Sequence, residues 1–241
     1  MKALILLISL IFFPLAIAAD EIEIWGEEFS PFGYIENGKH SGMVTEIVQH
    51  LINDTGISVK AWHMAPWARA FKEAKETPNT LLYTVVRKSD REDLFHWIGP
   101  VSDRTIYLFK LTSRKDIQVS SWEDIQHYNV GSLIGGASTE NLESHGIHTD
   151  KVSNIALNVK KLLAGRLDLI DMLDDSLAHI AKQEGEPLAQ FEKVWLADQS
   201  KKYYIALNKN TPPSIVARLQ SSFLSLENNG TLKTIQNKYL Q

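Results

Sequence analysis

The segment Thr84–Pro100 of the 241-residue chain reads TVVRKSDREDLFHWIGP. It opens with three β-branched residues, which are typical of a buried strand, and this strand runs into a charge cluster that contains Arg87 and Arg91. Ligands of α/β sheets bind beyond the carboxyl ends of the strands, and a guanidinium pairs with a carboxylate through two parallel hydrogen bonds. The segment therefore predicts an anion site at the end of a strand, with a solvated turn as the alternative.

Strand-like and helix-like stretches alternate on both sides of this segment. Residues 21–25 alternate apolar and polar side chains as a strand does, whereas the apolar residues of 44–52 have helical spacing. The same patterns predict further strands at 57–62, 81–86, 106–109, 129–133, 151–152, 167–172, 194–196 and 202–207, and a hairpin at 32–40. They predict further helices at 66–74, 121–125, 139–144, 156–164, 177–183, 212–228 and 230–239. This alternation indicates an α/β protein with mostly parallel strands.

Two polar stretches indicate that the chain forms two lobes, for which its length is sufficient. The stretches lie near 110–116 and 198–202, and polar residues between periodic segments are typical of connections. We predict that the first lobe comprises residues 20–110 and 201–241, and that residues 111–200 form a second, inserted lobe.

Residues 1–19 have the character of a secretory signal peptide. Lys2 supplies the positive charge, residues 3–17 are almost wholly apolar, and Ala16-Ile17-Ala18 fits the small-residue rule for cleavage. An uncleaved anchor helix is the alternative. The chain contains no cysteine, so it must fold without disulfides, which suits a bacterial periplasm better than a small extracellular module. We therefore predict a periplasmic protein.

The composition argues against several classes of function. The formal net charge of −4 is opposite to the basic surface expected of a nucleic-acid-binding protein. The lack of cysteine excludes thiol catalysis and cysteine-bound metal, and the eight histidines show no paired metal-ligand spacing. We therefore expect no nucleic-acid partner, no metal site and no cofactor.

A second candidate anion site lies in the sequence GGASTE at residues 135–140. It follows a predicted strand and leads into a predicted helix, with Ser138 close to the start of that helix. Such a loop directs backbone N–H groups toward an anion. It is neither a Walker motif nor a dinucleotide fingerprint, because it lacks the Gly-Lys-Ser/Thr of the first and the three spaced glycines of the second.

Several short motifs occur in an order that resembles a known protein family, from about Glu23 to Tyr239. They are FSPF at 29–32, GMVTEI at 42–47, PW at 66–67, SDR at 89–91, VG at 130–131, GAS at 136–138, LLAGRLD at 162–168 and GTLKTIQNKY at 230–239. Each motif is weak alone. Together they resemble the bacterial extracellular solute-binding proteins of family 3, the periplasmic polar-amino-acid binding proteins of ABC importers.

The resemblance implies a type II periplasmic-binding fold, in which two lobes close on a small zwitterion like a flytrap. In this family an arginine binds the ligand carboxylate and an acid binds the ligand amine. The positions that match the carboxylate contacts are Arg91 and Ser138. Thr84 and Val86 match positions that make hydroxyl or backbone contacts. Phe32 and Tyr34 match the mouth of the cleft, and Trp67 matches a residue that packs against the ligand.

This chain departs from the family pattern in two places. Val86 stands where a hydroxyl residue is usual, and Arg87 beside it is an additional cation. The amine-binding acid of the family falls on Leu173, so Asp171 and Asp174 are the nearest substitutes. These departures put an ordinary amino-acid ligand in doubt.

We expect a binding protein that captures a small zwitterionic or anionic solute as a monomer and delivers it to an ABC permease in the inner membrane. Arg69, which follows the predicted helix start at Pro66, is a further candidate that points either into the cleft or to the surface. A first alternative is a cleft enzyme such as a dehydratase, with Asp171 or Asp174 as the general acid or base. A second alternative is a ligand-sensing partner of a membrane receptor.

Overall fold

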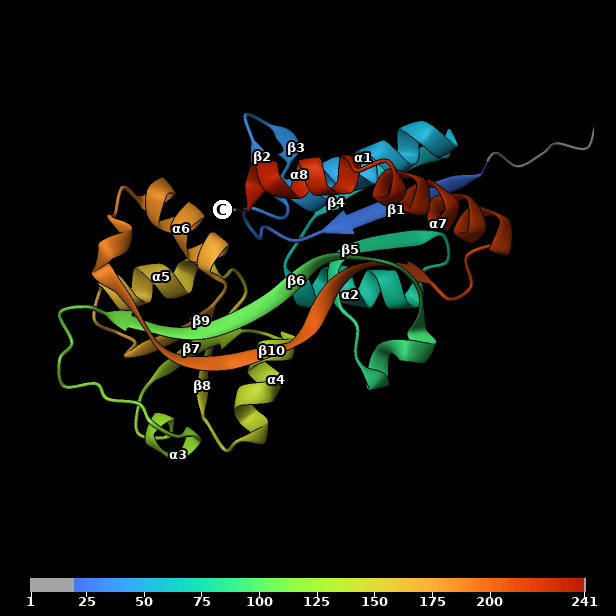
Figure 1. Ribbon diagram of the computed structural model, residues 1–241. Coiled ribbons are helices and arrows are strands. Elements are labelled where there is room, and N and C mark those ends of the chain that lie inside the picture. The colour runs from blue at the N-terminus through green and yellow to red at the C-terminus, as the bar shows by residue number, and fades with distance from the viewer. Residues whose placement is uncertain (1–19, 241) are drawn as a thin grey trace, which may run out of the picture.

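The computed structural model describes residues 20–240, and the predicted signal peptide lies outside this range. The described chain forms two α/β halves that are joined by two long neighbouring strands (Figure 1). Among these residues, no helix combines the length and the apolar character needed to cross a lipid bilayer.

The elements follow one another largely as the sequence pattern predicts. The strands are β1 (Glu21–Gly26), β2 (Tyr34–Glu36), β3 (Lys39–Ser41), β4 (Ser58–Met64), β5 (Thr80–Val86), β6 (Phe95–Leu111), β7 (Val130–Leu133), β8 (Thr149–Val152), β9 (Leu169–Met172) and β10 (Phe191–Asn208). The α-helices are α1 (Met43–Thr55), α2 (Trp67–Glu76), α3 (Trp122–Ile125), α4 (Ala137–Ser144), α5 (Ala156–Leu163), α6 (Asp174–Glu184), α7 (Pro213–Asn228) and α8 (Thr231–Tyr239). Two 3₁₀ turns, η1 (Ser89–Leu94) and η2 (Leu188–Gln190), complete the order.

One sheet runs through both halves in the strand order β4-β1-β5-β10-β6-β9-β7-β8. Strand β1 pairs in parallel with β4 and β5 in the first half, and β7 pairs in parallel with β8 and β9 in the second half. The antiparallel pairs are those made by β6 and β10. The predicted α/β class with mostly parallel strands within each half is therefore confirmed.

The connecting strands are longer than the sequence pattern predicts. Strand β6 has 17 residues and β10 has 18, whereas the pattern predicts a strand only at 106–109 and two separate strands at 194–196 and 202–207. The polar stretch near 198–202 resembles a loop, but its backbone pairs with β6. The predicted lobe boundaries fall at the end of β6 and in the middle of β10.

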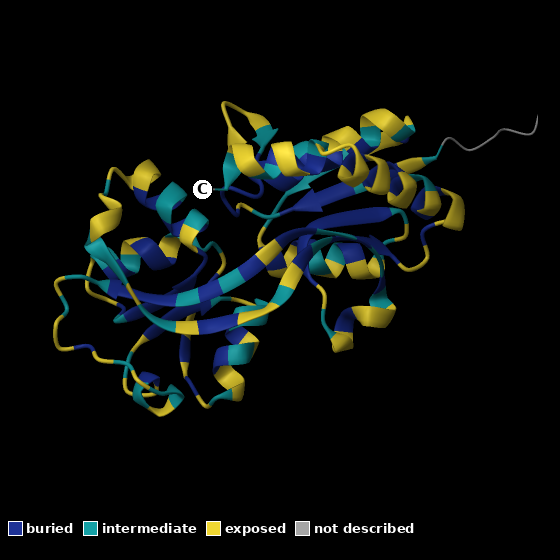
Figure 2. Cartoon of the chain, in the orientation of Figure 1, coloured by how far each residue is buried: buried dark blue, intermediate teal, exposed yellow. Residues whose placement is uncertain are grey.

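Helices cover both faces of the sheet in each half (Figure 1). In the first half α1, α7 and α8 pack together on one face and α2 lies on the other. In the second half α5 and α6 pack on one face, and α4 contacts β7, β8 and β10. The inner strands β5 and β9 are wholly buried, the edge strand β4 is not, and outward-facing helix residues are exposed (Figure 2). The apolar periodicity of each helix thus directs its packing side.

Candidate functional site

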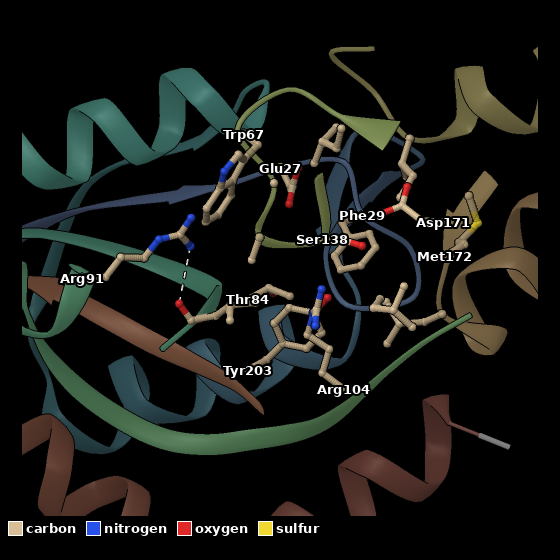
Figure 3. A pocket seen from close by; sticks show the side chains of 17 residues that line it. Glu27, Phe29, Trp67, Thr84, Arg91, Arg104, Ser138, Asp171, Met172 and Tyr203 are labelled. Carbon is tan, nitrogen blue, oxygen red and sulfur yellow. Dashed lines mark hydrogen bonds between the residues drawn. The ribbon is translucent and has the colours of Figure 1, made fainter. Parts of the chain in front are cut away.

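A cavity lies where the two halves meet, beside the long strands (Figure 3). It encloses about 520 Å³ of empty space, part of it open to solvent. Its polar and aromatic lining includes Glu27, Phe29, Trp67, Thr84 and Arg91 from the first half, Ser138 and Asp171 from the second half, and Arg104 and Tyr203 from the connecting strands. Both halves therefore contribute functional groups to one site.

Strand β5 directs Thr84 into this cavity through a local distortion. Leu82 and Val85 pair with Ala206 and Tyr204, so two residues of β5, Tyr83 and Thr84, lie opposite a single residue of β10. This is the arrangement of a β-bulge. Thr84 has φ of 62°, a conformation that β-branched residues rarely adopt, and its buried hydroxyl has no hydrogen-bond partner in the described structure. Strain of this kind is concentrated at functional sites.

Arg91 enters the cavity from η1, immediately beyond the end of β5. Its side chain is only 4% exposed and donates a long hydrogen bond from Nη1 to the Val86 carbonyl at 3.4 Å. The guanidinium lies over the rings of Phe71 and Trp67, at 4.8 and 5.5 Å from their centroids. Burial lowers the pKa of Arg91, and the charge of Glu140, 3.6 Å away across the cleft, partly offsets this effect. Its capacity to bind an anion is therefore largely unused.

Asp171 lies in the middle of β9 and faces Arg91 from the other half of the cavity (Figure 3). The residue is 3% exposed, and Oδ1 has no hydrogen-bond partner within residues 20–240. Burial raises the pKa of Asp171 to about 6, although the hydroxyls of Ser138 and Ser132 and the charge of Arg104 oppose this. Ser138, the second residue of α4, lies near this carboxyl, but within residues 20–240 its buried hydroxyl forms no hydrogen bond of good geometry.

Arg104 reaches the cavity from the connecting strand β6, and sequence reasoning missed it. Its guanidinium is 2% exposed and donates from Nη1 to the Asp198 carboxylate of β10 at 2.6 Å. Burial opposes ionisation of Asp198, but hydrogen bonds from Ser200 and Arg104 lower the pKa of Asp198 to about 2. Arg104 Nε has no partner among the described groups. Only the pairing of β6 with β10 reveals that this arginine lines the site.

Glu27 is the second charged residue that sequence reasoning missed. It follows Gly26, where an added Cβ would lie 2.2 Å from the Tyr83 ring, so β1 ends in close contact with that tyrosine. The Glu27 carboxylate points into the cavity (Figure 3). Burial raises its pKa to about 8. An acid placed directly after a buried strand and before the FSPF motif is the signal that was available.

Contacts across the cleft hold the two halves together in a closed arrangement. The Trp67 indole donates from Nε1 to the Gly135 carbonyl at 2.8 Å. Lys88 forms an ion pair with Glu140 of α4. The Tyr34 ring packs on His179 of α6 with centroids 5.0 Å apart. The cavity is therefore enclosed by residues from both halves.

Two of the predicted arginines lie outside the cavity lining. Arg87 donates from Nε to Glu92 at 2.9 Å, and its guanidinium packs on the Tyr204 ring at 5.5 Å. Arg69 lies over the Trp25 ring at 5.7 Å. The structure thus places both cations on aromatic side chains outside the cavity.

Three other predicted residues also lie away from the lining. Asp174 forms an ion pair with Lys193 at 2.6 Å, at the start of α6. Phe32 is buried in the core against Tyr203, with centroids 5.4 Å apart. Tyr34 contacts the second half without lining the cavity. In contrast, Trp67, Thr84, Arg91, Ser138 and Asp171 come together as lining residues.

The arrangement of charges determines what the cavity can do. The Arg91 guanidinium faces the Asp171 carboxyl across the cavity (Figure 3). Within residues 20–240, Asp171 Oδ1 and the hydroxyls of Thr84 and Ser138 have no hydrogen-bond partner. A molecule with an anionic and a cationic end would satisfy these groups. No set of three or more metal-ligating side chains is grouped anywhere in residues 20–240.

Comparison with known proteins identifies the family pattern over nearly the whole described chain. Residues 24–241 match the family model described as "Bacterial extracellular solute-binding proteins, family 3". A search of curated protein sequences finds no significant match.

Many solved structures share the fold. An ancestral arginine-binding protein bound to arginine is similar, with a TM-score of 0.80 and 18% identity, over 92% of this chain and 99% of that one. A histidine kinase sensor domain with similarity to periplasmic binding proteins has a TM-score of 0.81 and 19% identity, over 91% of this chain and 95% of that one. The arginine-, lysine-, histidine-binding protein ArtJ from Geobacillus stearothermophilus has a TM-score of 0.77 and 16% identity, over 91% of this chain and 95% of that one. At these identities the likeness concerns the fold.

Proposed function

The chain belongs to family 3 of the bacterial extracellular solute-binding proteins, and from this premise we propose that it captures a small zwitterionic or anionic solute, such as an amino acid, for ABC import. The family consists of binding proteins, and the solute would be bound and released without reaction. We further propose that residues 1–19 direct the protein to the periplasm and are removed there.

One observation carries this proposal: Arg91 and Asp171 are both buried, and neither has a full set of partners in the cavity. A buried charge without a partner destabilises the fold, because desolvation is not offset. A ligand carboxylate on Arg91 and a ligand ammonium on Asp171 would supply both missing partners. Because the protein has already met the cost of burying these two charges, their pairing with a ligand would contribute more fully to affinity.

The neighbouring groups suit the same orientation of the solute. The hydroxyls of Thr84 and Ser138, which have no hydrogen-bond partner in the described part of the chain, are available to the ligand carboxylate. Backbone N–H groups at the start of α4 favour an anion there. The face of Trp67 lines the cavity beside Arg91 and offers an apolar surface. Closure would exclude water, which strengthens the ion pairs.

A thermal-shift screen of amino acids and small carboxylic acids tests the proposal. A ligand present at 100 times its Kd stabilises a protein by about 2.7 kcal/mol, which raises the Tm of a chain of this size by about 5 to 10 °C. Arg91→Ala should abolish that shift, whereas Arg166→Ala, which removes an exposed arginine of the second half, should retain it. A full shift in Arg91→Ala would contradict the assignment.

Transport and sensing differ in what happens in the cell. If the protein feeds an ABC permease, deletion of its gene should abolish uptake of the radiolabelled solute found in the screen. If it serves a sensor instead, uptake should persist and the transcriptional response to the solute should be lost. The released solute should have an unchanged mass, whereas turnover would produce a second species.

A further inference from the structure

We propose that the solute carries a second cationic group, an ammonium or guanidinium on its side chain, and that the Glu27 carboxylate binds it. This inference rests on the proposed capture of a zwitterion and names the class of that solute: an α-amino acid with a net positive charge.

When each charged residue of the cavity is matched with a partner of opposite charge, one acid is left over. Arg104 is paired with Asp198. The carboxylate and ammonium of a zwitterion would match Arg91 and Asp171. Glu27 then remains, and within residues 20–240 no hydrogen bond or ion pair holds its carboxylate. Because it lines the cavity, a ligand cation is the partner that balances the site.

Arg91 and Arg104 line the same cavity, but within residues 20–240 no lysine, arginine or histidine forms an ion pair with the Glu27 carboxylate. Tyr83 of β5 and Tyr203 of β10 lie close enough for the charge of Glu27 to raise their pKa values, after the larger effect of burial. The adjacent Glu28 accepts a hydrogen bond from the Ile35 backbone. Burial, without an opposing charge, raises the pKa of Glu27 to about 8. Without an opposing charge this carboxyl favours its protonated form at neutral pH, and a cationic ligand would displace the proton.

A second hollow borders Glu27 and offers a place for a long side chain. This hollow of about 460 Å³, again partly open to solvent, shares Glu27 with the first and is lined also by Glu28, Pro66 and Asn154. An extended side chain that passes Glu27 would enter this hollow. The two neighbouring acids at its wall favour a cationic rather than an anionic or apolar end.

Isothermal titration at pH 7 with two matched pairs of ligands tests the inference. L-arginine is compared with L-citrulline, which replaces the guanidinium by a neutral ureido group. L-lysine is compared with L-norleucine, which keeps the α-ammonium and lacks the ammonium of the side chain. A charge-assisted hydrogen bond corresponds to about tenfold to hundredfold in affinity. We expect a cationic member to bind more tightly than its neutral partner by that factor.

The variant Glu27→Gln is nearly isosteric and distinguishes the carboxylate from the shape of the site. It should equalise the two members of each pair while retaining binding of the neutral one, which also shows that the variant is folded. Titration in phosphate and in Tris, whose ionisation enthalpies differ, should reveal more proton release on binding of the cation by the wild type than by Glu27→Gln.

Three results would overturn the inference: equal or tighter binding of citrulline and norleucine, a preference for cations that survives in Glu27→Gln, or binding of neutral or acidic amino acids alone. The last result would leave the proposed function intact if Arg91→Ala abolished it. Failure of every amino acid and carboxylic acid to bind would instead contradict the proposed function itself.

Discussion

The indole Nε1 of Trp67 donates a hydrogen bond to the main-chain carbonyl of Gly135 at 2.8 Å, and the two residues belong to opposite halves of the chain. Gly135 immediately precedes the Gly136 N-cap of α4, the helix that carries Ser138. The bond therefore holds closed a cavity whose wall includes the Trp67 ring itself. Opening of the two halves would break it.

Trp67→Phe should accelerate release of the solute. The variant keeps an aromatic face and removes the N–H donor, at a cost of about 0.5 to 1.5 kcal/mol. We expect the dissociation rate to rise about threefold to tenfold with little change in association, measured by surface plasmon resonance. Trp122→Phe, in α3 of the second half, is the control, and an unchanged dissociation rate in Trp67→Phe would show that the bond does not stabilise the closed form.

Asp171→Asn and Asp174→Asn should differ sharply in their effects on binding. Asp171 has a free oxygen in the cavity, whereas Asp174 is paired with Lys193 outside it. Loss of a charge-assisted hydrogen bond to the ligand amine should weaken binding by about tenfold to hundredfold in Asp171→Asn only. Titration calorimetry gives both values. Equal effects would mean that the acid of the site has been assigned incorrectly.

Arg87→Ala should leave the affinity for the solute within about twofold of wild type, because its exposed pair with Glu92 lies outside the cavity and such pairs contribute little. The same titration measures this. A loss comparable to that of Arg91→Ala would show that both arginines at the end of β5 bind the solute.

The stability of the ligand-free protein should depend on pH through Glu27. Its pKa is raised from 4.5 to about 8, so between these values the unfolded state binds fewer protons than the folded state. Stability then falls as pH rises through this window. We expect the unfolding free energy of the wild type, measured in urea, to fall relative to that of Glu27→Gln as the pH rises from 5 to 8. A difference that is constant or increases with pH would contradict burial of this carboxyl.

Sequence periodicity predicted most elements because packing on a central sheet requires one apolar face from each helix, as in α1. It failed for β6 and β10, whose middle segments are strands although they contain polar residues such as Asp103 and Lys202. There each strand pairs its backbone with the other, so strand structure does not need a buried face. Only long-range pairing could have revealed this.

The candidate site was predictable where it depends on local sequence. Arg91 follows a buried strand and Ser138 begins a helix, and both positions are visible in the chain. Arg104 was not predictable, because its place in the cavity depends on the register between β6 and β10 and on Asp198, 94 residues away. Phe32 and Phe29 belong to one motif, yet the turn directs Phe29 to the cavity and Phe32 to the core.

Native mass spectrometry of the mature protein, incubated with an equimolar pool of amino acids, tests whether Arg91 holds the bound solute. Arg91→Ala is measured in parallel. We expect one adduct on the wild type with the mass of a single amino acid, and none on the variant. An adduct of equal intensity on Arg91→Ala would contradict capture of a carboxylate between Arg91 and the second half of the chain.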